Sequence, residues 1–145
     1  MTVRLSIIIP AYNEADRIRP ALDACDRLCD TLPFESEIIV VDDGSTDDSA
    51  ETVTSLGSLR VRLIRHTDNR GKGAAVRTGM LAASGTYRLF TDADNSTPIA
   101  FALPFIKRLD SGADVVIGSR RLPGSRILHK QKPTRDVLGA LFRSF

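Results

Sequence analysis

Residues 37–47, EIIVVDDGSTD, place a continuous apolar run directly before two aspartates, a glycine and a serine. A strand with one solvated face alternates apolar and polar residues, whereas a parallel strand that helices cover on both faces reads as an unbroken apolar run. The aspartate, glycine and serine that follow are typical of a turn and of the N-cap of a helix. We therefore predict a buried parallel strand over 37–41 and a helix after it.

The same alternation of apolar runs and helical segments recurs along the chain. Strand-like runs lie at 4–9, 37–41, 60–64, 86–90 and 114–118, and helical segments at 14–32, 47–56, 71–83 and 98–109. Apolar residues that recur at intervals of three and four identify the first helix. The alternation predicts one α/β domain over residues 1–145, with helices on both faces of a mostly parallel sheet.

Composition and charge narrow the class of protein. Of the 145 residues, 42% are hydrophobic and 26% charged, and the formal net charge is +2. There is thus no overall field of the kind that indicates a nucleic-acid partner. The N-terminal stretch lacks the layout of a signal peptide, and no apolar run approaches the roughly 20 residues that span a bilayer. With Cys25 and Cys29 interpreted as packing thiols in a reducing compartment, we expect a cytoplasmic protein.

Polar stretches follow all five predicted strands. In an open parallel sheet the ligand binds in a crevice at the carboxyl ends of the strands. Because parallel strands end at the same edge, we expect these stretches to meet there and form a site. They are Pro10–Glu14, Asp42–Ser45, His66–Lys72, Asp92–Asp94 and Ser119–Arg121.

Two of these stretches have a structural explanation as well as a functional one. Asp42 and Asp43 repel each other unless something binds them, and a nucleoside base or ribose could donate a hydrogen bond to one of them. The alternative is a turn with a helix cap. Gly71 and Lys72 at a helix start offer free N–H groups and a cation to a phosphate, but a plain helix-opening loop has the same composition.

Asp92-Ala93-Asp94 is the sharpest motif. Residues two apart in an extended segment point the same way, so both carboxylates can face one divalent cation. Mg²⁺ or Mn²⁺ held by one or two carboxylates together with substrate phosphates fits this pattern. An EF-hand loop starting at Asp92 is excluded, because its sixth and twelfth positions are Thr97 and Leu103. A phosphatase-like nucleophile and a strand that ends in capping aspartates remain as alternatives.

Five motifs taken together resemble the family 2 glycosyltransferases of the GT-A fold. They are IIIPAYNE, VVDDGSTD, NRGKGAAVRTGM, FTDADNSTP and VIGSR, in family order and rough spacing over nearly the whole chain. The sequence is most similar to the polyprenyl-phosphate sugar synthases, the dolichyl-phosphate glucosyl- and mannosyltransferase type. The resemblance implies a nucleotide-diphosphate sugar donor (UDP-glucose or GDP-mannose), a polyprenyl-phosphate acceptor, a divalent cation, and inversion at the anomeric carbon.

Carried over by position, the resemblance also implies site residues. Those that would contact the nucleotide sugar are Pro10, Ala11, Tyr12, Glu14, Asp42, Asp43, Gly71, Lys72, Asp92 and Ala93. Within this set Asp43 resembles the acid that recognises the base. Asp92 and Asp94 correspond to the metal-binding DxD pair, with Asp94 as the more direct ligand and a catalytic residue. Arg120 resembles the arginine near the acceptor phosphate and is the second catalytic candidate.

One position departs from the mannose-type pattern, which has a glutamine two residues beyond the second aspartate. This chain has Ser96 there, which favours the glucosyl-type branch and leaves the rest of the metal's ligands open. Because a phosphate acceptor is already anionic, arginines are expected to matter more than a histidine at the acceptor side. His66 and His129 are accordingly interpreted as structural or peripheral, and a role for His66 stays open because it lies near the donor loop.

The basic stretch 119–145 includes an amphipathic segment whose apolar residues share one helical face. Such a helix is typical of a membrane surface or of packing against further protein. We expect peripheral contact with the cytoplasmic face of a membrane and leave homo-oligomers open. Family members continue well past the equivalent of Phe145, so the chain is expected to be a donor-binding fragment with an incomplete acceptor side.

Two other function classes stay open at this point. LFTDADNST matches a haloacid-type phosphatase motif with Asp92 as nucleophile, although that motif normally lies on the first strand rather than the fourth. A non-enzymatic, metal-binding regulatory α/β domain is the second alternative.

Overall fold

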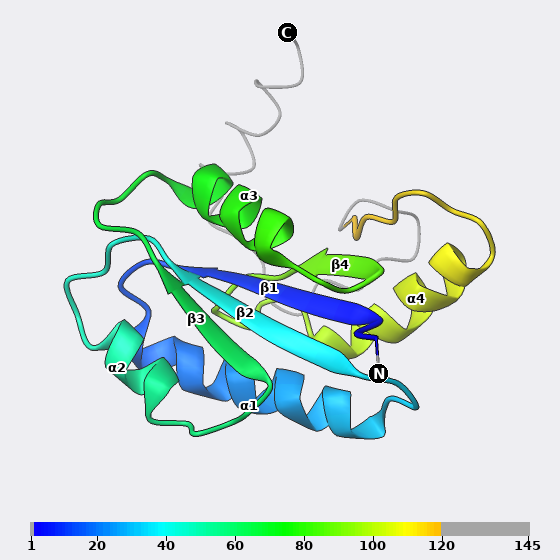
Figure 1. Ribbon diagram of the computed structural model, residues 1–145, viewed down its shortest axis with the longest axis horizontal. Coiled ribbons are helices and arrows are strands. Elements are labelled where there is room, and N and C mark those ends of the chain that lie inside the picture. The colour runs from blue at the N-terminus through cyan, green and yellow to red at the C-terminus, as the bar shows by residue number, and fades with distance from the viewer. Residues whose placement is uncertain (1, 120–145) are drawn as a thin grey trace, which may run out of the picture.

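The computed structural model describes residues 2–119, and at its centre lies a four-stranded parallel sheet (Figure 1). The strands are β1 (Leu5–Ala11), β2 (Ser36–Asp42), β3 (Val61–Arg65) and β4 (Tyr87–Phe90), in the order β3-β2-β1-β4. Ile8 of β1 lies opposite Ile39 of β2 and Phe90 of β4. The first four predicted strands are therefore confirmed.

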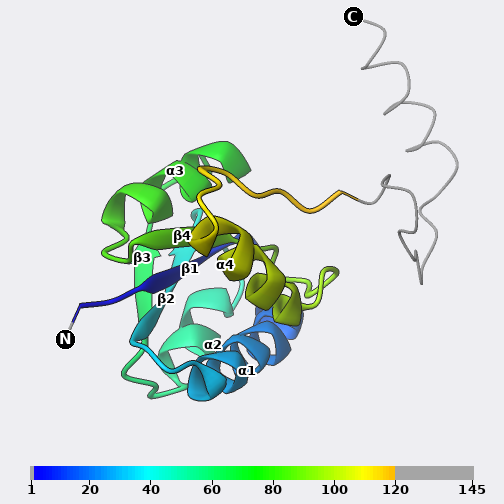
Figure 2. The same cartoon turned by 90° about the vertical axis from the view of Figure 1, so that its right-hand side faces the viewer.

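Helices form a layer on each face of the sheet. They are α1 (Ala15–Thr31), α2 (Ser49–Thr54), α3 (Lys72–Ala82), the short 3-10 helix η1 (Ile99–Phe101) and α4 (Ala102–Asp110). α3 covers one face, and α1 and α2 cover the other (Figure 1, Figure 2). The three-layer α/β/α architecture that the alternation predicts is thus present.

The apolar side chains of β1 and β2 contribute to two separate hydrophobic cores, one on each face of the sheet. Ile8 and Ile39 pack in the core beneath α3, whereas Ile7, Ile9 and Ile38 pack in the core that α1 covers. All five side chains are completely buried. Burial of one such side chain contributes roughly 1.5–3 kcal/mol. Because successive residues of a strand point to opposite faces, a strand between two helix layers must be apolar at every position.

Gly79 allows α3 to lie directly on β1. A Cβ at this position would be 2.4 Å from Cγ2 of Ile8, closer than two carbon atoms approach. A larger residue would therefore push the helix away from the sheet. This contact holds the start of α3, which begins at Lys72, at the carboxyl edge of the sheet.

The order of the strands creates a switch point beside β1. From β1 the chain crosses to β2 and β3 on one side and then returns to place β4 on the other side. In doubly wound sheets the connections at such a point leave in opposite directions and open a crevice for ligands. The loops after β1 and β4 flank this crevice in the present fold.

The fifth predicted strand, 114–118, is wrong. The structure describes this segment, and it forms neither helix nor strand. Val115 and Ile117 are 78% and 79% exposed, so their side chains are not packed on the sheet. An apolar run becomes a strand only where an adjacent edge pairs with its N–H and C=O groups, and the segment pairs with none of β1 to β4.

Cys25 and Cys29 lie on the buried face of α1 as free thiols. Burial raises the pKa of Cys25 to about 12, and it also raises the pKa of Cys29. Both thiols are therefore protonated at neutral pH and serve as small apolar side chains in the core.

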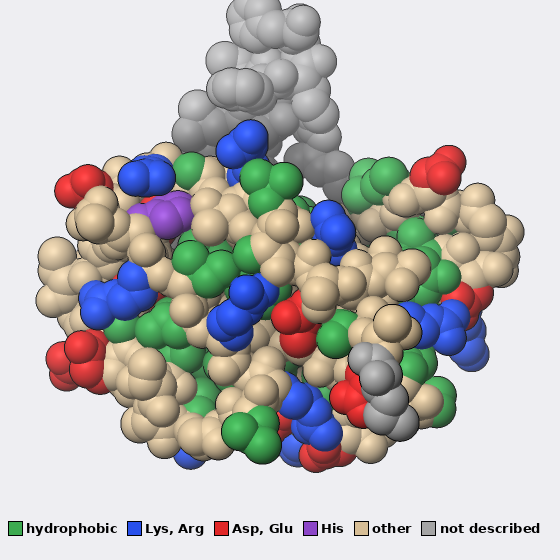
Figure 3. All heavy atoms as spheres, viewed as in Figure 1, with side chains coloured by type: hydrophobic (Ala, Val, Ile, Leu, Met, Phe, Trp, Pro, Cys, Tyr) green, Lys and Arg blue, Asp and Glu red, His purple; other side chains and the backbone are tan. Residues whose placement is uncertain are grey.

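The surface carries charges of both signs. On the face shown in Figure 3, basic and acidic side chains are interspersed rather than gathered by sign. Among residues 2–119, none of the helices combines the length and the hydropathy that a bilayer crossing requires.

Candidate functional site

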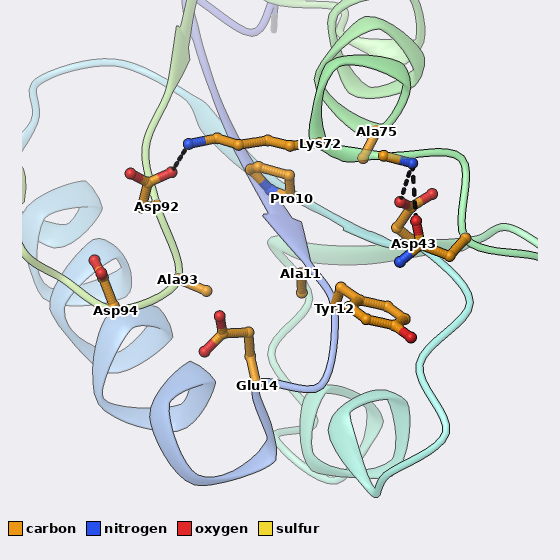
Figure 4. A pocket seen from close by; sticks show the side chains of 12 residues that line it. Pro10, Ala11, Tyr12, Glu14, Asp43, Lys72, Ala75, Asp92, Ala93 and Asp94 are labelled. Atoms are coloured by element: carbon orange, nitrogen blue, oxygen red, sulfur yellow. Dashed lines mark hydrogen bonds and ion pairs between the residues drawn. The ribbon is translucent and has the colours of Figure 1, made fainter. Parts of the chain in front are cut away.

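A pocket of about 340 Å³ opens at the carboxyl edge of the sheet (Figure 4). It is lined by Pro10, Ala11, Tyr12, Glu14, Asp43, Asn69, Gly71, Lys72, Ala75, Asp92, Ala93 and Asp94. These residues come from the end of β1, from the loops that follow all four strands, and from the start of α3. Every predicted nucleotide-sugar residue except Asp42 therefore lies around one cavity, as do both predicted metal ligands.

Asn13 controls how the loop after β1 enters the pocket. Its φ is 54°, a left-handed conformation that asparagine adopts more readily than most residues. The Asn13 side-chain oxygen accepts a hydrogen bond from the N–H of Thr46 (2.9 Å), and the Asn13 N–H donates to Oγ of Ser45 (2.9 Å). The bend places Tyr12 and Glu14, on either side of Asn13, in the pocket wall.

The loop after β2 caps the N-terminus of α1. Oδ2 of Asp47 accepts a hydrogen bond from the N–H of Ala15 (3.1 Å), and Oγ of Ser49 accepts one from the N–H of Glu14 (2.8 Å). A hydrogen bond from the Ser49 hydroxyl is the largest of the effects that lower the pKa of Asp47. A carboxylate at this position also opposes the positive end of the helix dipole. The first two loops are consequently fastened to each other.

The paired aspartates after β2 have different partners. Asp42 is 1% exposed, and its Oδ2 accepts a hydrogen bond from Nε of Arg65 at 3.0 Å. Its Oδ1 accepts one from the N–H of Ser45 at 3.1 Å. Asp42 is absent from the pocket lining, unlike Asp43. The repulsion expected between the two carboxylates is relieved by the protein's own donors, and Asp42 acts within the fold.

Asp43 lies in the pocket wall as a buried and well-partnered carboxylate. Its Oδ1 accepts a hydrogen bond from the N–H of Arg70 (3.0 Å) and lies 2.6 Å from Nδ1 of His66. Its Oδ2 accepts one from the N–H of Gly71 (2.7 Å). Burial by itself would raise the pKa of Asp43, but these donors outweigh it and the pKa is lowered. Asp43 is therefore ionised and held in a single orientation.

Gly44 explains why this strand end reads Asp-Asp-Gly. Its φ is 74°, and a Cβ would lie 2.7 Å from the carbonyl carbon of Asp68 and 2.8 Å from the backbone nitrogen of Asn69. No side chain fits between these two backbones. The glycine thus allows the loop after β3 to approach close enough for its N–H groups to reach Asp43.

Lys72 and Asp92 form an ion pair across the pocket. Both side chains are about half exposed, at 58% and 47%. The Lys72 ammonium also lies 6.0 Å from the ring centroid of Phe90. Exposed pairs of this kind hold together weakly, so each partner is available to a ligand that offers a stronger charge.

Three carboxylates, Glu14, Asp92 and Asp94, line the same side of the pocket (Figure 4). Burial raises the pKa of Glu14, and the negative charges of Asp94 and Asp92 raise it further, whereas Arg17 opposes the shift. Oε2 of Glu14 is buried and lies 2.7 Å from Nε of Arg17, but it accepts no hydrogen bond of good geometry. This side of the pocket holds more negative charge than its own donors balance.

The donor set fits a hard divalent cation that substrate oxygens complete. Carboxylate oxygens are the ligands that Mg²⁺ prefers, and Mg²⁺ commonly takes only one or two of them from the protein. Within residues 2–119, no three histidine, cysteine or acidic side chains are close enough to hold a metal by themselves. Oδ1 of Asp94 accepts a hydrogen bond from the N–H of Ser96 (2.9 Å), which fixes its carboxylate in the loop.

His66 is the residue whose place in the site the sequence did not reveal. Its side chain is 6% exposed and lies between Asp43 and Thr78 of α3. It does not line the pocket, in agreement with the expectation of a structural or peripheral residue. The available signal was its position directly after β3, beside the strand that ends at Asp42. Arg120, His129 and the amphipathic segment lie outside the described residues.

Comparisons with known proteins agree with this geometry. The model of the family "Glycosyl transferase family 2" matches residues 6–144. A dolichyl-phosphate beta-glucosyltransferase of Dictyostelium discoideum is 36% identical over 99% of this chain. The chain spans 48% of that protein, slightly less than half its length.

Solved structures of glycosyltransferases are also similar to this chain. A mannosyltransferase of Pyrobaculum calidifontis, in complex with GDP-Man and Mn²⁺, is 32% identical over 65% of this chain and 28% of its own, with a TM-score of 0.56. A glucosyl-3-phosphoglycerate synthase of Mycobacterium tuberculosis, in complex with Mn²⁺ and UDP, is 28% identical over 63% of this chain and 33% of its own, with a TM-score of 0.53. These likenesses confirm the fold class and favour neither a phosphatase nor a regulatory domain.

Proposed function

The chain belongs to the glycosyl transferase family 2, and we propose that it provides the donor-binding part of an enzyme that moves a hexose from a nucleotide-diphosphate sugar to a polyprenyl phosphate. The observation that carries the proposal is the single pocket that joins Tyr12 and Asp43 to Asp92 and Asp94. The named activity of the Dictyostelium relative supports the choice of acceptor.

The nucleoside is proposed to bind at the Tyr12 and Asp43 end. Tyr12 is 45% exposed and offers an aromatic face to a base. Asp43 is ionised, and three protein donors occupy its two oxygens. Because two carboxylate oxygens can accept about four hydrogen bonds, Oδ2 keeps capacity for one further donor. A base N–H is the natural partner for it.

The diphosphate is proposed to bind at the opposite end of the pocket. Asp92 and Asp94 would hold Mg²⁺ or Mn²⁺, and both neighbours described above contain Mn²⁺. When bound, such an ion neutralises the charge that develops on the leaving diphosphate. Lys72 adds a positive charge on the same side, at the start of α3, where helix geometry favours anions.

The transfer itself requires one bond to break and one to form. The bond from the anomeric carbon to the diphosphate oxygen breaks, and an oxygen of the acceptor phosphate bonds to that carbon from the opposite face. The configuration is thereby inverted, and the nucleoside diphosphate leaves. Because the acceptor oxygen is already anionic, no proton must be removed. The pocket residues would therefore contribute by orienting the donor, so that its anomeric carbon faces the incoming acceptor oxygen.

Calorimetry with UDP and with GDP, each with and without Mn²⁺, tests this proposal on the 145-residue chain. We expect one of the two nucleotides to bind, and to bind much more tightly with the metal. Asp94→Ala should abolish the metal-dependent part. Asp23→Ala, which removes an exposed aspartate on α1, should leave binding unchanged and serves as the matched control. If the wild-type chain binds neither nucleotide, the proposed function is wrong.

A further inference from the structure

We propose that His66 is a positioning residue. One ring nitrogen contacts Thr78 and the other contacts Asp43, so that the ring fixes the orientation of Asp43, and of the turn before α3, toward the donor nucleoside. The inference rests on the proposed function, since it assigns His66 a task in the same pocket. His66 touches no ligand in this scheme and acts only through Asp43.

The contacts of His66 define its task. Nδ1 lies 2.6 Å from Oδ1 of Asp43, and Nε2 lies 2.9 Å from Oγ1 of Thr78. Both ring nitrogens therefore have a partner, and the side chain is only 6% exposed. An imidazole with both nitrogens engaged behind the pocket wall is poorly placed to exchange a proton with a substrate. Its fixed ring is well placed to orient a carboxylate.

The hydrogen bonds of Asp43 carry the effect of His66 to the pocket. Nδ1 donates to the carboxylate, because an ionised carboxylate accepts only. The same carboxylate accepts the N–H groups of Arg70 and Gly71, at 3.0 and 2.7 Å. Asp43 thus links β2 to the turn that opens α3, and both Asp43 and Gly71 line the pocket. Removal of the imidazole would leave Oδ1 with the N–H of Arg70 as its remaining donor among these three, and the carboxylate could then rotate.

The backbone around His66 is already fixed by the sheet. The N–H of His66 donates to the carbonyl of Asp42 at 2.8 Å, which continues the pairing of β3 with β2. Gly44 packs against the backbone of Asp68 and Asn69. The main chain therefore stays in place when the imidazole is removed, and the change is confined to the orientation of Asp43 and its turn.

The position of Asp43 predicts which part of a ligand is affected. Figure 4 shows Asp43 and Tyr12 on the far side of the pocket from Asp92 and Asp94, with Pro10 and Ala11 between the two ends. A nucleotide that uses both ends should lose affinity when His66 is changed. The Mn²⁺–pyrophosphate complex, which uses only the Asp92 and Asp94 end, should not.

Two substitutions of His66 separate its hydrogen bond from its volume. His66→Asn places an amide N–H near the Nδ1 position and retains a donor for Asp43, whereas His66→Leu has no donor. We expect His66→Leu to bind UDP roughly tenfold more weakly, because a carboxylate that is free to rotate must be ordered when the nucleotide binds. His66→Asn should stay within about threefold of wild type, because it keeps the hydrogen bond to Asp43. GDP replaces UDP if the wild type binds GDP.

Thr78 provides a second pair of variants in case His66→Leu fails to fold. Thr78→Val removes the hydroxyl but keeps the shape, and Thr78→Ser keeps the hydroxyl. We expect a several-fold loss of nucleotide affinity in Thr78→Val and recovery in Thr78→Ser, with thermal denaturation used to confirm that each variant is folded. Affinity for Mn²⁺–pyrophosphate should change less than about twofold in all folded variants.

The outcomes separate this inference from the proposed function. A wild-type chain that binds neither UDP nor GDP removes the proposed function and the inference together. A wild-type chain that binds a nucleotide while His66→Leu binds it equally well removes only the inference. The inference is also overturned if His66→Asn loses as much as His66→Leu, or if nucleotide and Mn²⁺–pyrophosphate affinities fall together.

Discussion

The two ends of the pocket are built in opposite ways. At one end, Asp43 is buried, its pKa is lowered, and three donors of the protein hold its oxygens. At the other end, Asp92 is half exposed, and Lys72 is its one ion-pair partner within residues 2–119. The pKa of Glu14 is raised by burial and by its acidic neighbours. At the first end the donors of the protein already balance the carboxylate and leave room for one further donor, whereas the second end carries negative charge that a cation would balance.

This difference between the two ends predicts whether a substitution mainly changes the free energy of unfolding or the affinity for a ligand. A carboxylate inside a finished hydrogen-bond network contributes to folding, because its removal leaves donors buried and unpaired. A carboxylate in an unbalanced acidic group contributes little to folding or opposes it, and is explained by what it binds. Substitutions at the two ends should accordingly affect different measurements.

The largest effect is expected from Asp43→Asn. The amide would place an N–H group against the ring N–H of His66, which is 6% exposed, or against the N–H of Gly71 or Arg70, so that one donor of the network loses its acceptor. We expect the free energy of unfolding to fall by about 3 kcal/mol. Urea denaturation measures this change. Asp68→Asn, at an exposed aspartate in the neighbouring loop, is the control and should stay within about 0.5 kcal/mol of wild type. Equal stability of the two variants would remove the contrast between the ends.

Asp94→Asn should show the reverse behaviour. Asparagine keeps the oxygen that accepts the hydrogen bond from Ser96, so the loop and the unfolding midpoint should be unchanged. The loss of a charged metal ligand should weaken nucleotide binding in Mn²⁺ by about thirtyfold, or about 2 kcal/mol. Calorimetry in Mn²⁺ and in EDTA checks both parts. Asp114→Asn serves as the control, and a large drop in stability for Asp94→Asn would contradict the interpretation.

Lys72→Gln is expected to have a smaller effect on binding. The pair with Asp92 is exposed, so the change in unfolding free energy should be below about 0.5 kcal/mol. Loss of the positive charge near the diphosphate should weaken nucleotide binding about fivefold, and this loss should shrink as salt is added. A titration series at increasing ionic strength tests it. Affinity independent of Lys72 at all salt concentrations would exclude its role at the diphosphate.

The smallest effect is expected from Glu14→Gln and depends on pH. Because the pKa of Glu14 is raised in the folded chain, the folded state binds more protons than the unfolded state in the window above the ordinary glutamate pKa of about 4.3. Ionised Glu14 therefore lowers stability as pH rises through that window. Glu14→Gln should stabilise the chain at pH 7 by less than about 1 kcal/mol and not below pH 4. Denaturation of Glu14→Gln and wild type at pH 7 and below pH 4 tests this. A lower stability of Glu14→Gln at pH 7 would show that the ion pair of Glu14 with Arg17 outweighs the effects of burial and of the acidic neighbours.

Low pH should decrease the free energy of unfolding through Asp43 and Asp47. Both have a lowered pKa, so each contributes stability that is fully present above the ordinary aspartate pKa of about 3.9. That stability is lost as the pH falls through the lowered values in the folded chain. Asp43→Asn should flatten the acid limb of the stability curve, and an unchanged limb would contradict the assigned network.

Strands and helices were predictable because each depends on residues close in sequence. The runs around Ile8 and Ile39 indicate their strands directly, and the four-strand core agrees with them. The prediction for 114–118 failed because a strand also needs a neighbouring strand that pairs with its N–H and C=O groups, and the apolar run around Val115 does not show whether such pairing occurs. The pairing of His66 with Asp43 was not predictable for a related reason, since the convergence of strand ends brings their loops together but does not show which side chains meet.

The sequence by itself determined the alternation of strands and helices and the convergence of polar strand ends, because side-chain periodicity and strand direction suffice for both. Only the tertiary structure decided which charge meets which. Asp42 binds Arg65 and Asp43 binds His66, each 23 positions away, and Asp92 pairs with Lys72, 20 positions away. Such partners are chosen by the loops that the sheet brings together, and adjacent aspartates at one strand end can therefore have separate roles: Asp42 within the fold and Asp43 in the wall of the pocket.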